Sequence, residues 1–197
     1  MPKIVDHDQR RAELVRVVWK VIARDGIEGA TVRRVAQEAG VSTGGLRHYF
    51  DSQHGLLEFA AEAVAASVAT RLLSHTDPQL MLEEFLPLDE QRQVEVDVWL
   101  ACLMRARVDS SLAELRRASW AGERHVCRLA VAYCRGASSP ARIGDELPAD
   151  LEQRALRLHV FIDGLTLQAA AFPDQLSTQD IRSALRTELD LIREGDR

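Results

Sequence analysis

Apolar residues recur along almost the whole chain with the spacing of amphipathic helices. One such stripe predicts a first helix over residues 9–25 and consists of Leu14, Val17, Val18, Val21 and Ile22. Gly26 suits the C-terminal cap of this helix, because glycine tolerates the left-handed backbone that such caps require. Nowhere does the alternation of apolar and polar residues that marks a strand persist, so the pattern predicts an all-α fold.

Two short helices are predicted next. Thr31 is a candidate N-cap for the second helix, which Gly40 would end, and Ser42 is a candidate N-cap for a very short third helix. The apolar residues of that third segment that can reach a common small core are Leu46, Tyr49 and Phe50.

Longer helices are predicted for the rest of the chain. Asp51 and Ser52 open a fourth helix that runs to about residue 74, and Ser111 with Glu114 resembles a capping box. Further helices are predicted over residues 78–86, 89–107, 111–135, 148–172 and from 177 onward. We therefore expect about nine helices, divided between a three-helix domain over residues 1–50 and a larger helical domain over residues 51–197.

The composition is ordinary for a globular protein, with 46% apolar and 28% charged residues in a chain of 197. No apolar run is long enough to cross a bilayer, and the first residues lack the apolar core of a signal peptide, so we expect a cytoplasmic protein with no membrane partner. The cysteines form no C-x-x-C pair and are interpreted as small buried apolar residues: Cys102, Cys127 and Cys134.

Charge is distributed unevenly along the chain. The formal net charge is −5, yet residues 1–50 carry +3 and the remaining residues carry −8. A local cationic surplus attracts phosphate groups even when the whole chain is acidic. The overall acidity therefore does not exclude a nucleic-acid partner for the N-terminal domain.

Residues 26–50 form the most informative segment, because two short helices joined by a tight Gly-Val-Ser turn are the layout of a helix-turn-helix. Residues 26–57 resemble the DNA-binding domain of the TetR family of bacterial transcriptional regulators. The string GIEGATVRRVAQEAGVS, followed by GL, HYF and GLL, carries the resemblance, which is greatest to the BetI-type branch. Beyond about residue 60, only chain length and helix order agree with the family.

The resemblance implies a regulator that represses transcription, with double-stranded operator DNA and a small-molecule effector as partners and no cofactor. Arg47 can bond guanine bidentately, and Thr43 can contact a thymine methyl group. Glycine lets the backbone approach DNA closely, and the start of the second helix suits phosphate contacts. The candidate DNA-binding residues are Thr31, Arg33, Ser42, Thr43, Gly44, Arg47, His48, Tyr49 and Gln53.

Two positions depart from the family pattern, and a third is ambiguous. Arg47 stands where many members carry tyrosine, which suggests a guanine near that position of the operator. Gln53 stands where they carry a phosphate-binding lysine, so one charge-assisted contact is lost. The ring of Tyr49 can pack inward while its hydroxyl reaches a phosphate.

A palindromic operator requires a dimer, which we expect to form through the last two helices as an isologous four-helix bundle. The alternative is that the apolar stripes of these helices face the core of their own protomer. The expected interface residues are Leu158, Ile162, Leu165, Ala169, Ile181, Leu185 and Leu189.

Residues of the middle helices are candidates for an effector pocket: Trp99, Met104, Trp120, His125, His159, Phe161, Asp163 and Gln168. Each also has an ordinary interpretation, since the tryptophans suit a core and His159 can bond Asp163 one turn away. Asp163 lies in an apolar run where we expect burial, and an unpaired buried carboxylate is costly. It could meet a cationic ligand or an arginine, Arg105 or Arg128.

Other function classes receive less support. No Gly-rich phosphate loop, H-E-x-x-H or G-x-S-x-G motif is present, so the sequence does not predict an enzyme. The six histidines show no metal-ligand spacing, and we expect no metal. A thiol- or metal-responsive regulator with the same DNA-binding head is the alternative, although Cys127 and Cys134 lie too far apart on one helix for a disulfide.

Overall fold

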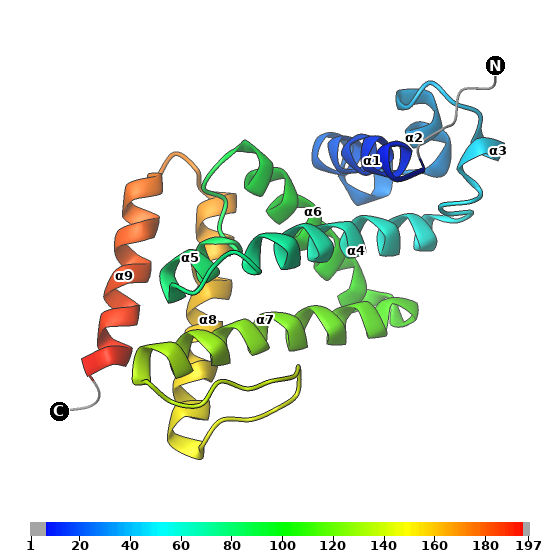
Figure 1. Cartoon of the computed structure of the whole chain (residues 1–197). Coiled ribbons are helices and arrows are strands. Elements are labelled where there is room, and N and C mark those ends of the chain that lie inside the picture. The colour runs from blue at the N-terminus through cyan, green and yellow to red at the C-terminus, as the bar shows by residue number, and fades with distance from the viewer. Residues whose placement is uncertain (1–6, 195–197) are drawn as a thin grey trace. The chain divides into compact units, whose positions relative to one another are not determined.

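The computed structural model describes residues 7–194, and all the regular structure of those residues is helical. Figure 1 shows the helices in chain order. The α-helices of the described residues are α1 (His7–Gly29), α2 (Val32–Glu38), α3 (Thr43–Leu46), α4 (Gln53–Leu72), α5 (Pro78–Glu83), α6 (Glu90–Val108), α7 (Ala113–Arg135), α8 (Ala149–Ala171) and α9 (Thr178–Glu194). The predicted all-α class is confirmed, and no helix in this range is long and apolar enough to cross a membrane.

The described residues pack as two compact units. Unit 1 contains the residues up to Ala66 together with Asp97–Arg116, and unit 2 contains Ser67–Val96 and the residues from Arg117 onward. The division thus falls inside α4, α6 and α7 rather than at residue 50. Parts of three long helices therefore pack in the same unit as the first fifty residues. The predicted boundary at residue 50 separates functional domains rather than packing units, and it stays a prediction.

The glycines expected at two helix ends do adopt left-handed backbone. Gly26 has φ 69° and interrupts α1, so that a second short stretch of helix continues to Gly29. Gly40 has φ 66° and follows the end of α2. A side chain at either position would strain the backbone. Gly26 thus produces a kink near the end of α1, and Gly40 lies in the turn between α2 and α3.

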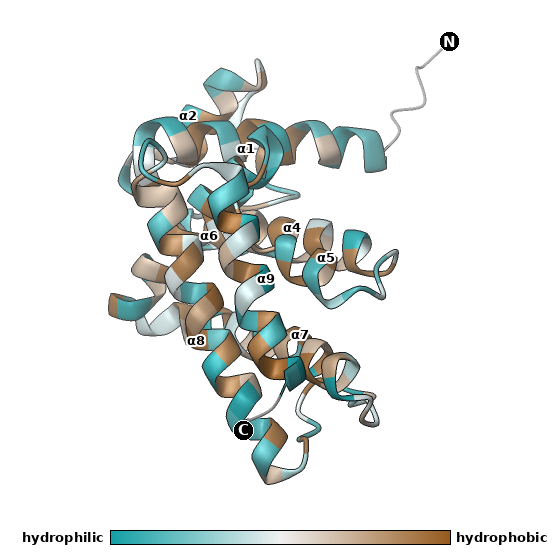
Figure 2. Ribbon diagram, turned by 90° about the vertical axis from the view of Figure 1, so that its left-hand side faces the viewer, coloured by the Kyte–Doolittle hydropathy of each residue, from teal (hydrophilic) through white to brown (hydrophobic). Residues whose placement is uncertain are grey.

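Unit 2 has a continuous hydrophobic core to which α5, α7, α8 and α9 contribute. The residues predicted to form a dimer interface contribute to this core: Leu158, Ile162, Ala169, Ile181, Leu185 and Leu189 are at most 3% exposed, and Leu165 packs against the cluster while partly buried. Figure 2 shows how hydrophobic and hydrophilic residues mix along α8 and α9. The six buried side chains are covered by their own protomer, which favours the alternative interpretation for them, whereas Leu165 stays partly exposed. A dimer contact through α8 and α9 stays a prediction.

The start of α7 also differs from the prediction. Asp109, rather than Ser111, caps this segment: its side chain accepts a hydrogen bond from the Ser111 backbone N–H at 3.1 Å and begins a short 3-10 helix, Ser110–Leu112. The capping box predicted from Ser111 and Glu114 is therefore wrong, because an aspartate two residues upstream offers a stronger acceptor.

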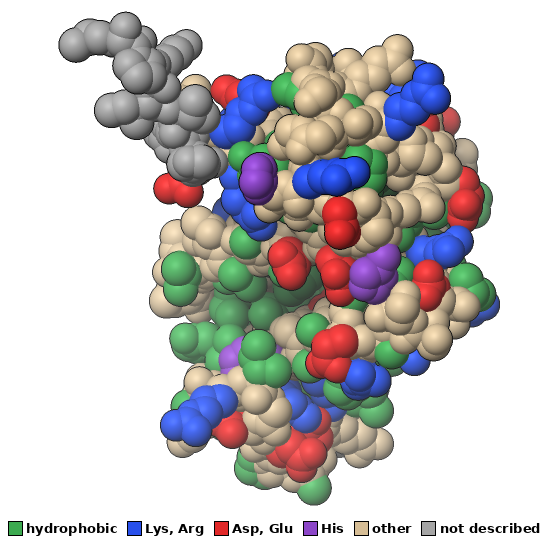
Figure 3. All heavy atoms as spheres, turned by 90° about the vertical axis from the view of Figure 1, so that its right-hand side faces the viewer, with side chains coloured by type: hydrophobic (Ala, Val, Ile, Leu, Met, Phe, Trp, Pro, Cys, Tyr) green, Lys and Arg blue, Asp and Glu red, His purple; other side chains and the backbone are tan. Residues whose placement is uncertain are grey.

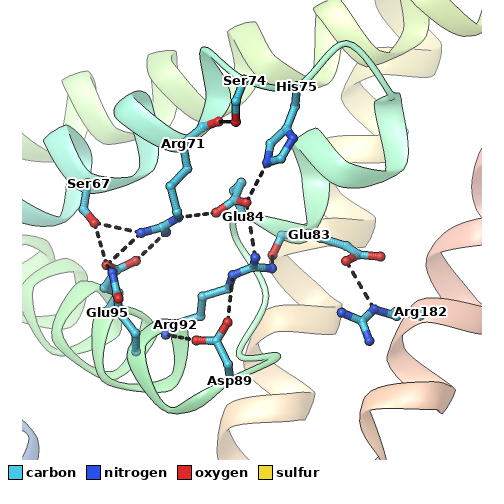
Figure 4. A network of polar contacts seen from close by, with 11 residues as sticks. Ser67, Arg71, Ser74, His75, Glu83, Glu84, Asp89, Arg92, Glu95 and Arg182 are labelled. Atoms are coloured by element: carbon cyan, nitrogen blue, oxygen red, sulfur yellow. Dashed lines mark hydrogen bonds and ion pairs between the residues drawn. The ribbon is translucent and has the colours of Figure 1, made fainter.

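A network of buried carboxylates and arginines lies within unit 2 (Figure 4). Arg71 of α4 bonds Glu84, and also bonds Glu95 of α6 with 2.6 Å between Nη2 and Oε2. Glu84 is contacted in addition by His75 at 3.0 Å and Arg92 at 3.3 Å. Because both glutamates are almost fully buried, the guanidinium groups supply the positive charge that these carboxylates need.

Candidate nucleic-acid interface

Side-chain caps hold the two helices of the motif in place. The hydroxyl of Thr31 accepts a hydrogen bond from the backbone N–H of Arg34 at 3.2 Å at the start of α2. The hydroxyl of Ser42 accepts one from the backbone N–H of Gly45 at 3.2 Å at the start of α3. Both caps were predicted, and both are confirmed. They satisfy helix-terminal N–H groups that would otherwise lack partners.

The apolar side chains after the turn anchor α3 to the core of unit 1. Leu46 and Phe50 are buried, and the Phe50 ring centroid lies 5.4 Å from that of Phe59 on α4. The Tyr49 ring meets Phe59 edge-on at 6.2 Å, so the ring packs against unit 1, while contact of its hydroxyl with a phosphate stays a prediction. With its apolar side chains held in this way, α3 has a fixed outward face.

Four of the predicted residues lie on this outward side, two within α3 and two directly after it. Thr43, Gly44, Arg47 and His48 are all exposed, and the described residues provide no ion-pair partner for Arg47 or His48. A threonine methyl, a guanidinium and an imidazole offer one apolar contact and several hydrogen-bond donors to base edges. These four predicted residues therefore lie close together at the surface, and their contact with DNA stays a prediction.

The glycines of α3 are not required by the fold. Neither Gly44 nor Gly45 has positive φ, and a Cβ atom at Gly44 would come no closer than 3.9 Å to the Ser42 hydroxyl, an ordinary contact. Glycine in a helix costs about 1 kcal/mol relative to alanine. Its presence at an exposed, unstrained position points to a close approach by something outside the protomer, as the sequence predicted for DNA.

Ion pairs divide the basic residues of α1 and α2 into two groups. Lys20 and Arg24 pair with Glu38, and Arg24 and Arg34 pair with Asp25. These contacts hold the pKa of Asp25 and of Glu38 below their usual values, chiefly through Arg24 and Lys20 respectively.

The second group has no such partners. Arg33 is exposed and has no ion-pair partner among the described residues, as is also true of Arg47. On the face of the molecule in Figure 3, Lys and Arg side chains lie interspersed with Asp and Glu side chains. Cations without carboxylate partners are the ones available for phosphates, so Arg33 and Arg47 are the best-placed of the predicted contacts.

Gln53 has a structural role that the sequence did not reveal. Its side-chain amide donates a hydrogen bond to the backbone carbonyl of Ile27 at 3.0 Å. This contact ties the start of α4 to the end of α1. The amide is exposed, and its oxygen remains available as an acceptor.

The effector candidates fall into separate groups. Trp120, His159 and Asp163 come together on α7 and α8: the Trp120 and His159 ring centroids are 5.7 Å apart, and His159 Nε2 lies 3.8 Å from Asp163 Oδ2. Asp163 was expected to be buried, but its side chain is 47% exposed, and Arg105 and Arg128 pair with other carboxylates. Its position on the outer side of α8 explains the difference.

Sequence analysis missed the buried carboxylate at this place, which is Glu123 of α7. Glu123 is 6% exposed, and its Oε2 lies 3.8 Å from His159 Nε2. Burial raises the pKa of Glu123 and also that of Asp163. The available signal was the helical spacing of Glu123, four residues before the buried Cys127 on the apolar side of α7.

The remaining candidates do not join this group. Phe161 lines a shallow groove of about 470 Å³ together with Leu156, Arg157, Val160 and Glu188. His125 is half-buried with an Nδ1 atom that lacks a hydrogen-bond partner, and Gln168 is exposed. Trp99 and Met104 belong to unit 1, where Met104 is 54% exposed.

The three cysteines are free thiols, two of them buried as predicted and Cys134 partly buried. Burial raises the pKa of Cys102 to about 12 and that of Cys127 well above its usual value. The thiolate is the reactive form, so these side chains are poorly suited to sensing oxidants.

Comparison with known proteins covers most of the chain. Residues 14–60 match the family described as bacterial regulatory proteins, tetR family, and residues 75–194 match the family described as BetI-type transcriptional repressor, C-terminal. The resemblance inferred from residues 26–57 is thereby confirmed, and it extends far beyond the first 60 residues.

Individual relatives agree along their full length. HTH-type transcriptional regulator PksA of Bacillus subtilis (strain 168) is 33% identical over 200 residues, covering 98% of this chain and 94% of the relative. HTH-type transcriptional regulator BetI of Burkholderia ambifaria (strain MC40-6) is 30% identical over 206 residues, covering both chains completely. The crystal structure of a transcriptional regulator from Rhodococcus sp. Rha1 superposes with a TM-score of 0.77 at 30% identity, covering 94% of this chain and 96% of that one.

Proposed function

Because the chain belongs to the TetR family of bacterial transcriptional regulators, we propose that it is a repressor that binds a palindromic operator as a homodimer. One α3 from each protomer enters the major groove, with the two copies about one DNA turn apart. A small-molecule effector that binds the DNA-incompetent conformation better than the competent one releases the operator. Proteins of this family are regulators rather than enzymes.

The outward face of α3 is the observation that carries this proposal. Thr43, Gly44, Arg47 and His48 take no part in the protomer's core or its ion pairs, yet caps and buried apolar residues hold their backbone in one place. Such preorganised, unpartnered donors are expected where a ligand outside the protein completes the contacts. The matching C-terminal family is described as transcriptional repressors, which supports repression rather than activation.

The homodimer needs a contact face other than the buried stripes. The outer side of α8 carries Leu156, Val160 and Leu167, which are 47%, 64% and 51% exposed and follow helical spacing. Leu191 on α9 is also 53% exposed. Apolar residues repeated along one side of a helix at the surface favour pairing with a second copy. We assign the four-helix dimer contact to these residues.

Two substitutions, one within α3 and one directly after it, test the DNA-binding role. Arg47→Ala should lower discrimination between operator variants by about 1–3 kcal/mol if the guanidinium bonds a guanine. Gly44→Ala should weaken operator binding while raising the stability of the free protein by about 0.4–1 kcal/mol, because alanine restricts the unfolded chain. Fluorescence anisotropy on operator DNA and thermal denaturation measure the two effects.

Arg186→Ala is the matched control, since it removes the same charge from an exposed position on α9. It should leave discrimination unchanged. If Arg47→Ala and Arg186→Ala weaken binding equally at every operator variant, Arg47 does not read bases. If Gly44→Ala binds operator normally, the backbone of α3 does not approach DNA closely.

The dimer face has its own test. Val160→Glu should shift the protein toward monomer in sedimentation velocity experiments. Operator affinity should fall as well, because the proposed DNA-binding species is the dimer. Leu73→Glu, at a position that is 90% exposed after α4, controls for the added charge on an exposed apolar residue. A Val160→Glu protein that sediments as the wild type does would place the contact elsewhere.

A further inference from the structure

Three side chains of unit 2 bring ligand atoms of the kind that metals bind to one place. Glu123 comes from α7, and His159 and Asp163 come from successive turns of α8. One ligand atom from each lies within 4.8 Å of the others, and His159 Nε2 is 3.8 Å from a carboxylate oxygen of both acids. The imidazole nitrogen therefore lies between two carboxylates contributed by two helices.

The burial of this cluster distinguishes it from an ordinary acidic surface. Glu123 and His159 are 6% and 2% exposed, so neither group is solvated freely. A buried carboxylate is strongly disfavoured unless a cation or hydrogen-bond donors compensate for the lost water. Within the described residues, His159 is the only ion-pair partner of Glu123, and His159 also faces Asp163. One imidazole serves two carboxylates.

The other buried glutamates of unit 2 each have an arginine partner, which Glu123 lacks. Glu83 pairs with Arg182, and both Glu84 and Glu95 pair with Arg71. In the described part of the chain, Glu123 is the one buried glutamate that no arginine or lysine contacts. The sequence supplies arginines next to Glu123, but Arg124 and Arg128 both bond Glu152 instead. Apart from His159, no basic residue in the described part of the chain contacts Glu123.

We propose that Glu123, His159 and Asp163 form a site for a divalent transition-metal ion of the zinc type. One imidazole and two carboxylates are a donor set that such ions accept, and hard cations such as Mg²⁺ favour all-oxygen sets. Metal–ligand bonds of about 2.0–2.2 Å in a tetrahedral site place ligand atoms about 3.4 Å apart. The two contacts of His159 at 3.8 Å need only a small contraction.

In the protomer, one side of the site is open to an entering ion, and this side adjoins the proposed dimer contact, because Asp163 lies between Val160 and Leu167 along α8. The Asp163 side chain is 47% exposed and can adjust its position when an ion binds. Trp120 is 55% exposed, and its ring lies 5.7 Å from the His159 ring. Three protein ligands and one open position leave room for water or a further ligand on the metal. This proposal does not depend on the DNA-binding role and holds or fails without it.

Binding is measured on tag-free, chelator-treated full-length protein. Titration with ZnCl₂ by isothermal calorimetry should give one ion per chain, and thermal unfolding should move to higher temperature with ZnCl₂ present, since a ligand of the folded state stabilises it. Co²⁺, a paramagnetic probe, should quench tryptophan emission through its proximity to Trp120, and the Trp120→Phe protein should lose most of that quenching.

Conservative variants test the assignment of ligands. Glu123→Gln and His159→Gln should each weaken Zn²⁺ binding at least 100-fold, because losing a direct ligand exceeds the 10–100-fold effect of an outer contact. Asp163→Asn, at an exposed position that the fold does not need, should also weaken it at least 10-fold. His125→Gln, on the same helix as Glu123 and outside the cluster, should bind as the wild type does.

Two outcomes would overturn the proposal. Absence of Zn²⁺, Mn²⁺ and Co²⁺ binding at micromolar concentrations in the wild-type protein would mean that Glu123 is held as a neutral acid beside His159. Binding that survives in Glu123→Gln and Asp163→Asn but falls in His125→Gln would place the metal at another histidine.

Discussion

The ion pairs of α1 and α2 lie at the surface, whereas those of unit 2 involve carboxylates taken out of water. Lys20, Arg24 and Arg34 share Asp25 and Glu38, and the lysine and both arginines are at least 41% exposed. In unit 2, the side chains of Glu84 and Glu95 are 2% and 3% exposed and depend on Arg71. Surface ion pairs contribute little to the free energy of unfolding, whereas removing one partner of a buried pair lowers it strongly.

Solvent exposure determines in which region a charged side chain can remain without a partner inside the protein. In the first region, water solvates any cation that has no partner, so Arg33 and Arg47 remain free for an external phosphate or base. In unit 2, each buried carboxylate must be compensated within the fold. Glu123 is the exception, because its only ion-pair partner among the described residues is His159, and the proposed metal ion would supply the missing charge.

The largest expected effect comes from removing the shared guanidinium of unit 2. Arg71→Met leaves the buried Glu84 and Glu95 without their main cation and should destabilise the protein by about 3–5 kcal/mol. Urea denaturation monitored by circular dichroism measures it. The triple variant Arg71→Met, Glu84→Gln, Glu95→Gln should recover a large part of the loss. A single variant as stable as the wild type would show that these carboxylates tolerate burial alone.

Glu123→Gln should not destabilise the metal-free protein, in contrast to Arg71→Met. Because no arginine or lysine compensates Glu123, its neutral isostere should leave metal-free stability unchanged or raise it by about 1 kcal/mol. The measurement is the same denaturation in the presence of a chelator. A loss comparable to that of Arg71→Met would mean that the contact with His159 compensates the carboxylate fully, and the contrast between the two clusters would disappear.

The pH dependence of stability tests the ion pairs of Glu152, a carboxylate that two arginines compensate. Bonds from Arg128 and Arg124 lower the pKa of Glu152 from 4.5 in the unfolded chain to about 2 in the fold. The folded protein then binds fewer protons than the unfolded chain, so this stabilisation is complete above about pH 4.5 and is lost as the pH falls toward 2. Glu152→Gln should flatten this part of the stability curve. An unchanged acid slope would contradict the assignment.

The smallest effect is expected in the first region. Arg24→Ala removes two exposed ion pairs, to Asp25 and Glu38, and should leave the unfolding midpoint within experimental reproducibility, since water and Lys20 replace what is lost. Measured beside Arg71→Met under identical conditions, this variant gives the other end of the comparison. A large drop would show that the exposed pairs matter as much as the buried ones.

Local patterns were sufficient for much of the structure. Short-range interactions, between residues a few positions apart, determine the helical periodicity and the helix ends. The structure contains the predicted glycines at positions 26 and 40 and the predicted caps Thr31 and Ser42. The outward position of Thr43 and Arg47 follows from the same short-range rules once Leu46 turns inward. The sequence also identified the family through residues 26–57.

Contacts between distant segments could not be predicted in this way. Burial of the stripes on α8 and α9 depends on which neighbours cover them, and helical spacing alone cannot distinguish a protomer core from a dimer contact. The pairing of Arg128 with Glu152, and the meeting of Glu123 with His159, likewise depend on how α7 lies against α8. The helices and the helix-turn-helix motif could be predicted from the sequence, because helical hydrogen bonding and capping involve residues close together in the chain. Which charges are compensated depends on the packing of distant helices, because it requires knowing which side chains share a buried space.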